Sequence, residues 1–247
     1  MPGADKVKKG SRKAAAPRKA PKAAKPAVET RGKYVYCVIR AREPLLFGRL
    51  GLGIEPAEVH TVNYKDIAAV VSDTPMEVHD PTRENVLAHE RVNETVMRQH
   101  TVIPMSFGSV FKTRGDIIEL LRSAYDAFHD VLVKMQDKLE FGLKVLWDRD
   151  VAVREIEQQD EDVRRLKQEI FDALRDVAVA SRANKPIGDR MIMNAAFLVA
   201  RDKEQSFDAR VKEIGARLDK LTFKYTGPWP PYNFVNIRLK LERAKEK

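Results

Sequence analysis

The sequence predicts an α+β fold, with two α/β-layer domains of ferredoxin-like character preceded by a disordered basic tail. Segments with helical periodicity alternate along the chain with apolar, β-branched segments, a pattern that favours helices packed on sheets. The length of 247 residues suits two small domains. The first 32 residues are mainly Lys, Ala and Pro. They bury too little surface to offset their chain entropy, so we expect them to be disordered.

The predicted domain boundaries follow changes in the sequence pattern. Large apolar side chains first gather at Tyr34, and helical spacing gives way to alternation near Leu139. The chain therefore divides into four parts: a Lys/Ala/Pro-rich tail over 1–33, an amino-terminal α+β domain over 34–138, a carboxy-terminal ferredoxin-like domain over 139–235 and a charged tail over 236–247.

The positive charge of the protein is confined to the amino-terminal tail. Residues 1–33 hold eleven of the 45 Lys and Arg and two of the 36 Asp and Glu, which accounts for the whole net charge of +9. The other 214 residues hold 34 basic and 34 acidic side chains. Affinity for phosphates comes from clustered Lys and Arg. Binding to a nucleic acid or another acidic surface would thus act through the tail, and a merely solubilising tail is the alternative.

Cysteine usage and hydropathy predict a cytoplasmic protein with no membrane association. Cys37 is the one cysteine, so no internal disulfide is possible, as is usual in a reducing compartment. It lies in an apolar run, where we expect an inert buried thiol. No stretch approaches the ~18 apolar residues of a membrane span. The basic amino terminus is not followed by the apolar region of a secretory signal.

Strands of the first domain are predicted from runs rich in β-branched and aromatic residues. These runs cover residues 34–39, 59–64, 67–71 and 105–111. Only Lys65 and Asp66 separate the second run from the third, which is the length of a tight hairpin. The glycine-rich residues 47–53 predict a flexible loop, because the Lys and Ser or Thr of a phosphate-binding loop are missing.

Two helices are predicted in the first domain. The first, over residues 82–100, follows Pro81 and carries apolar residues near helical spacing. The second begins at Thr113, which with Asp116 resembles a capping box. It is expected to continue to Leu139, because apolar residues recur every three or four positions. These residues are Ile117, Leu121, Tyr125, Phe128, Leu132, Met135 and Leu139.

The second domain is predicted to follow the order β-α-β-α-β. Alternation or a continuous apolar run predicts its strands, and apolar stripes predict its helices. The strands cover residues 141–147, 191–200 and 221–225, and the helices cover 153–181 and 207–221.

No catalytic or metal-binding pattern in the sequence is complete. His89 and Glu90 begin like a zinc-protease motif, but Asn93 stands where the second His ligand is required. Ser106 lacks the preceding glycine of a nucleophile elbow. The remaining histidines, at no ligand spacing, are His60, His79, His100 and His129. The sequence predicts no enzyme, metal site or cofactor. A site around His89, Glu90 and Asn93 on a ferredoxin-like scaffold stays open as a separate hypothesis.

Residues 226–234, with the sequence Thr-Gly-Pro-Trp-Pro-Pro-Tyr-Asn-Phe, form an unusual segment. Its three prolines favour a stiff, extended backbone. Trp229, Tyr232 and Phe234 combine large apolar area with polar groups and are typical of protein contacts. They are therefore candidate partner-binding residues. The alternative is a rigid connection whose aromatic side chains close the core of the second domain.

Three blocks of the sequence are distinctive when taken together: Tyr34-Val35-Tyr36 with residues 68–72, His89-Glu90 with residues 101–111, and residues 227–234. Through these blocks the sequence resembles the gas vesicle GvpF/GvpL family from Tyr34 to about Phe234. Cys37 departs from the family pattern, which usually has a small residue such as Gly there. Residues 1–32 lie outside the pattern.

The resemblance implies a two-domain α+β protein located in the cytoplasm and at gas vesicles. It implies binding to the small hydrophobic shell protein and to other accessory proteins during vesicle formation. No catalytic residue is implied. Such a binder is physically reasonable, because apolar shell surface that is exposed before assembly otherwise aggregates.

Overall fold

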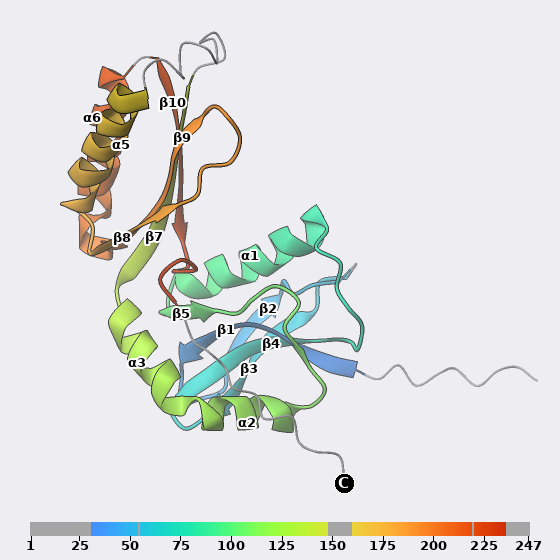
Figure 1. Cartoon of the computed structure of the whole chain (residues 1–247). Coiled ribbons are helices and arrows are strands. Elements are labelled where there is room, and N and C mark those ends of the chain that lie inside the picture. Colours follow the sequence, from blue (N-terminus) through green and yellow to red (C-terminus); the bar gives the residue numbers. More distant parts are fainter. Residues whose placement is uncertain (1–30, 54, 148–159, 219, 236–247) are drawn as a thin grey trace, which may run out of the picture.

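The computed structural model describes residues 31–53, 55–147, 160–218 and 220–235. Two antiparallel sheets form its frame, one in each half of the described chain (Figure 1). Helices cover these sheets, which confirms the predicted α+β class. Most of the predicted basic tail and all of the charged carboxy-terminal tail lie outside the described residues. No helix within the described ranges is long and apolar enough to cross a membrane.

The first sheet has a buried central strand, β1 (Arg31–Arg40). Its other strands are β2 (Leu46–Arg49), β3 (Glu58–Tyr64), β4 (Ile67–Pro75), β5 (Val102–Pro104) and β6 (Val110–Phe111). The order is β2-β3-β4-β1-β5, and β6 also pairs with β1. Helix α1 (Arg83–Met97) packs on one face of the sheet, and α2 (Arg114–Ser123) and α3 (Tyr125–Met135) pack on the other. Both faces of β1 are therefore covered.

Three local predictions in this half are confirmed. β3 and β4 form a hairpin in which Tyr64 pairs with Ile67, and Lys65 adopts a φ of 52° in the turn. Thr113 and Asp116 form the capping box at the start of α2. Cys37 is a fully buried free thiol. Burial raises the pKa of this thiol, so the reactive thiolate is disfavoured.

Two predictions in this half are only partly right, and glycines lie at both places. Residues 47–53 are expected to be a loop, and 50–53 lie outside any strand, but 47–49 belong to β2, which pairs with β3 with a register shift next to Gly48 at a φ of 93°. Residues 105–111 were expected to be one strand. Instead β5 and β6 pair separately with β1, and the turn between them contains Gly108 at a φ of 83°.

The long helix predicted to reach Leu139 is two helices followed by a strand. The helix breaks at Ala124, whose φ and ψ are −112° and 18°, and α3 ends at Met135. Both helices face the same hydrophobic cluster, so the apolar spacing continues across the break. Leu139 belongs to strand β7 and is buried in a different hydrophobic cluster, the one that includes the second sheet.

The second sheet has a ferredoxin-like arrangement. Its strands are β7 (Lys138–Trp147), β8 (Ala180–Asn184), β9 (Met191–Ala200) and β10 (Leu221–Trp229), in the antiparallel order β10-β7-β9-β8. Helix α5 (Asp160–Arg175) follows β7, and the short η1 (Arg201–Lys203) and α6 (Glu204–Arg217) follow β9. This half therefore reads β-α-β-β-α-β. Both helices lie on one side of the sheet (Figure 1).

The sequence does not predict β8, which lies at the edge of the second sheet. The helix expected over residues 153–181 ends at Arg175, and its first part, 153–159, lies outside the described residues. The β8 sequence, Ala-Ser-Arg-Ala-Asn, is small and polar and only partly buried. Nothing in that composition favours a strand.

The two halves of the molecule share part of their core. One hydrophobic cluster contains Tyr34 and Tyr36 from β1, Val96 from α1, and Leu139 and Phe197 from the second sheet. The predicted boundary at residue 139 falls next to the start of β7. That the halves are separate domains stays a prediction.

Candidate partner-binding site

Residues 230–235, which we call the strap, follow β10 and lie next to both halves of the molecule (Figure 1). Their polar contacts reach Asn93 on α1 as well as Glu140 on β7 and Asn184 on β8. Pro230 and Pro231 are buried, so the backbone here is held by rigid residues. The strap therefore connects the second sheet to the helix that covers the first.

Asn233 is the most extensively bonded residue of the strap. Its backbone nitrogen donates to Glu140 Oε2 at 2.7 Å, and its side-chain amide donates to Glu140 Oε1. Its side-chain oxygen accepts from Asn184 Nδ2 at 3.3 Å, and its carbonyl accepts from Arg182 Nη1 at 2.9 Å. Every polar group of Asn233 thus has a role in fixing the strap.

Glu140 is an acidic side chain buried on the sheet face that the helices leave open. Only 4% of it is exposed. Burial raises the pKa of this carboxyl, and the hydrogen bonds from Asn233 and the nearby charge of Arg182 only partly offset that increase. A buried carboxylate needs such donors to be tolerated, so Glu140 and the strap depend on each other.

Tyr232 has a fixed hydroxyl and an accessible ring. The hydroxyl accepts a hydrogen bond of 3.2 Å from Asn93 Nδ2 on α1. Burial of the hydroxyl, with the nearby charge of Glu90, raises its pKa. The residue as a whole is nevertheless 40% exposed. An aromatic ring anchored in this way loses little rotamer freedom when it contacts a partner.

The other two predicted partner-binding residues are half-buried. Trp229 is the last residue of β10 and pairs in register with Glu140. Phe234 lies within the strap. The structure thus brings Trp229, Tyr232 and Phe234 into one connection between the halves. Partner binding by these residues stays a prediction.

His89, the first candidate of the enzyme hypothesis, lies in a buried aromatic cluster. Its Nδ1 is 2.9 Å from the hydroxyl of Tyr34, and Tyr36 and Phe107 pack around its ring. The Tyr34 oxygen already accepts from the Gly108 amide at 2.9 Å, so its own proton is available for His89 Nδ1. Burial lowers the pKa of His89 to about 4, so its ring is neutral at pH 7.

Among the described residues, neither the Asn93 side chain nor the Glu90 side chain forms a hydrogen bond with the His89 ring. Asn93 Nδ2 donates to the His89 carbonyl at 3.2 Å and to the Tyr232 hydroxyl. Burial and the charge of Glu94 raise the pKa of Glu90. The amide nitrogen of Asn93 is thus engaged with the helix backbone and with the strap, whereas its side-chain oxygen is buried with no hydrogen-bond partner in the described parts of the chain.

The remaining candidates from the sequence lie apart from one another. His79 Nε2 is 2.8 Å from Thr74 Oγ1, and His129 Nε2 is 3.1 Å from a guanidinium nitrogen of Arg40. His100 packs edge-on against Phe47, His60 lies on β3, and the Ser106 carbonyl accepts from the Ser109 hydroxyl. Within the described ranges, no three His, Cys, Asp or Glu residues are grouped as metal ligands would be.

The sequence does not predict the roles of Glu140, Arg182 and Asn184. Glu140 lies at a polar position of a strand in which polar and apolar residues alternate, and the side chain at such a position is usually exposed. The only available signal is the Asn233 of the unusual segment itself, which does not specify its partner.

The fold and the candidate site together define an α+β protein. It has two sheets, a β-α-β-β-α-β second half and an aromatic strap at a polar junction between the halves. The model of the family described as gas vesicle synthesis protein GvpL/GvpF matches residues 32–170 and 164–236. The chain is 35% identical over 219 residues to gas vesicle protein F1 of Halobacterium salinarum, which covers 87% of this chain and 98% of that protein.

Two further comparisons agree. Gas vesicle protein F of Haloferax mediterranei is 33% identical over 198 residues, covering 78% of this chain and 89% of that protein. The crystal structure of GvpF from Anabaena sp. PCC7120 superposes with a TM-score of 0.73 at 24% identity, covering 84% of this chain and 97% of that one. The chain belongs to the gas vesicle synthesis protein GvpL/GvpF family. Membership assigns it a role in gas vesicle formation and confirms the family resemblance.

Proposed function

We propose that this protein is a non-enzymatic assembly protein that binds the small hydrophobic shell protein of gas vesicles and other accessory proteins. Its place of action would be the cytoplasm and the gas vesicle. Family membership supports this role. The observation that carries the proposed contact surface is the exposed ring of Tyr232, held by its buried hydroxyl.

The surface next to Tyr232 is suited to an apolar partner. Leu87 is 45% exposed on α1, the helix whose Asn93 donates to the Tyr232 hydroxyl. Trp229 and Phe234 are half-buried aromatic residues of the same segment as Tyr232. Rigid aromatic residues of this kind contribute much of the affinity at protein interfaces. Binding would cover shell surface that otherwise aggregates.

A capture experiment with the shell subunit tests this proposal. Five proteins are compared: the full chain, residues 31–247, Tyr232→Ala, Tyr232→Phe and the control Val133→Ala, which changes a side chain 48% exposed on α3. We expect equal capture by the first two and by the control. Capture by Tyr232→Ala should fall roughly tenfold. Tyr232→Phe should retain capture, because the ring remains.

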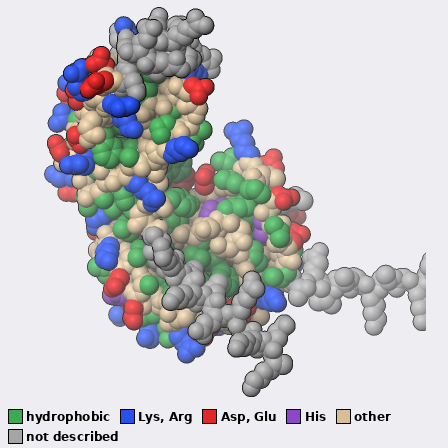
Figure 2. All heavy atoms as spheres, viewed as in Figure 1, with side chains coloured by type: hydrophobic (Ala, Val, Ile, Leu, Met, Phe, Trp, Pro, Cys, Tyr) green, Lys and Arg blue, Asp and Glu red, His purple; other side chains and the backbone are tan. Residues whose placement is uncertain are grey.

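The alternative is binding of a nucleic acid or another acidic surface through residues 1–33. It is favoured by the confinement of the net charge to that segment. On the face shown in Figure 2, Lys and Arg side chains are interspersed with Asp and Glu. Capture that is lost in residues 31–247 and falls steeply with salt would support this alternative. No capture by any of the five proteins would contradict the shell-binding proposal.

A further inference from the structure

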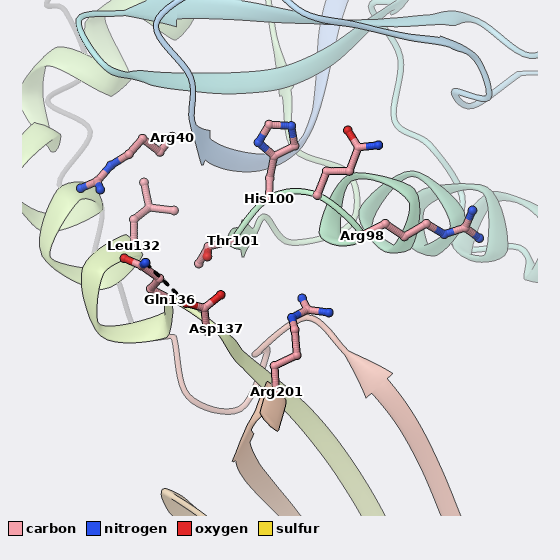
Figure 3. Close-up of a pocket in the computed structure, with 9 residues that line it drawn as sticks. Arg40, Arg98, His100, Thr101, Leu132, Gln136, Asp137 and Arg201 are labelled. Carbon is pink, nitrogen blue, oxygen red and sulfur yellow. Dashed lines mark hydrogen bonds between the residues drawn. The ribbon is translucent and has the colours of Figure 1, made fainter. Parts of the chain in front are cut away.

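We propose that a second site, a pocket where the two halves meet, binds an acidic peptide segment of a partner protein. The pocket has a volume of about 430 Å³. It is formed by the end of β1, the turn after α1, the end of α3 and the first residue of η1 (Figure 3). It shares no residue with the strap, so its role does not depend on what the strap binds.

Three arginines line this pocket, and in the part of the chain that the structure describes only one of them is paired with an acid. Arg40 Nε lies 4.0 Å from Asp66 Oδ2. Within the described ranges, Arg98 and Arg201 form no ion pair. One acid, Asp137, also lines the pocket. The lining thus has a positive excess, although the body of the protein is neutral.

The guanidinium group of Arg201 is available to a ligand. It points into the pocket from the second half of the molecule (Figure 3). Its one hydrogen bond to a described residue is the long contact of 3.4 Å from Nη2 to the Met97 carbonyl at the end of α1. A guanidinium has five N–H donors, so this contact with the helix end leaves most of them free to bind a carboxylate in the paired geometry typical of arginine.

The spacing of the arginines favours an extended ligand over a single small anion. In the view of Figure 3, Arg201 lies between Arg40 and Arg98, whose guanidinium groups point away from each other. A phosphate ion is compact and is bound by donors that converge on it. An extended peptide advances about 3.3 Å per residue, so successive acidic side chains can reach guanidinium groups that are spread in this way.

Substituting Asp137 gives a test in which the affinity for an acidic ligand should rise, not fall. Its carboxylate faces the same space and repels an anionic ligand. Its φ is 53°, a conformation that Asn tolerates well. Asp137→Asn therefore removes the repulsion with little change in backbone geometry. A purely structural role for the arginines predicts no such gain in affinity.

The test uses the full chain and a terminally blocked tetraglutamate peptide, with tetraglutamine as the matched control. Affinity is measured by calorimetry, and hydrogen exchange locates the protected residues. We expect protection at residues 98–101 and 201–203. Arg201→Gln and Arg98→Gln should each weaken tetraglutamate binding roughly fivefold, and Asp137→Asn should strengthen it by a similar factor. Arg210→Gln, an exposed arginine paired with Glu213 on α6, should have no effect.

Three outcomes would overturn the proposal. Protection confined to residues 1–33 would assign the binding to the basic tail. An equal loss in Arg210→Gln would indicate a general charge effect. Displacement of the peptide by equimolar inorganic phosphate would indicate a small-anion site. If Arg201→Gln does not fold, Arg98→Gln and Asp137→Asn still test the proposal, because their expected changes in affinity are opposite. Unchanged affinity in both variants would contradict the proposal.

Discussion

Asn233 is joined to Glu140 by two hydrogen bonds, one from its backbone and one from its side chain, although 93 residues separate them in the sequence. This contact holds the strap on the open face of the second sheet. It also provides the donors that a buried carboxylate requires. The position of the strap on the second sheet therefore depends strongly on this polar pair.

Substituting Asn233→Ala should destabilise the protein markedly. The change removes one of the two donors to Glu140 and leaves a carboxylate that is 4% exposed only partly satisfied. We expect the free energy of unfolding to fall by about 2–3 kcal/mol, as measured by urea titration. Asn184→Ala, which removes only a 3.3 Å contact with Asn233, is the matched control and should cost less. Equal losses in the two variants would contradict a dominant role for the Asn233–Glu140 pair.

Glu140 should also give the protein a characteristic pH dependence. Burial raises the pKa of its carboxyl in the folded state, so the folded state holds this proton more strongly than the unfolded state does. The contribution to stability is fully present below pH ~4.3 and is lost as the pH rises through the raised pKa. The stability of the wild-type protein relative to Glu140→Gln should therefore decline as the pH increases from that value. A difference that is constant between pH 4 and 7 would show that burial does not perturb the group.

His89 should produce an effect of the opposite sign. Burial lowers its pKa in the folded state to about 4, against ~6.5 for an unperturbed histidine. Its contribution to stability is present above pH ~6.5 and is lost as the pH falls towards 4, by about 3 kcal/mol in total. Unfolding titrations of wild type and His89→Asn at pH 7, 6 and 5 measure it. The slope in this range should be smaller in the variant, and identical slopes would refute the assignment.

Gly227 should tolerate no side chain, for two separable reasons. Its φ is 127°, and a Cβ would lie 2.9 Å from the Glu140 carbonyl oxygen. Gly108, at a φ of 83° with open space around its Cβ position, is the matched control for conformation alone. We expect Gly108→Ala to cost about 1 kcal/mol and Gly227→Ala about 3 kcal/mol of unfolding free energy. Similar costs would mean that the close approach to β7 relaxes easily.

The sequence predicts those parts of the fold that are determined by local chemistry. Thr113 and Asp116 cap a helix because both lie within one turn, and the hairpin at Lys65 follows from its two-residue connector. The split at Ala124 and the edge strand β8 are not predicted, because packing on a shared cluster and pairing with β9 stabilise them. Both depend on residues distant in the sequence.

The same distinction applies to the candidate site. The composition of the segment identifies Trp229, Tyr232 and Phe234 as unusual, but it does not indicate how much of each is exposed. The partners Asn93 and Glu140 are 139 and 93 residues away from the strap residues that they bind. A pairing of single polar groups over such separations leaves no periodic signal.

The position of the strap late in the chain has a consequence for biosynthesis. A ribosome that has completed Glu140 must add 93 more residues before Asn233 exists. Until then, the carboxylate of Glu140 and the amide of Asn93 lack the partners that the mature protein provides. The junction is therefore among the last regions to become complete, and a nascent chain that terminates early exposes an unsatisfied interface to proteases and chaperones.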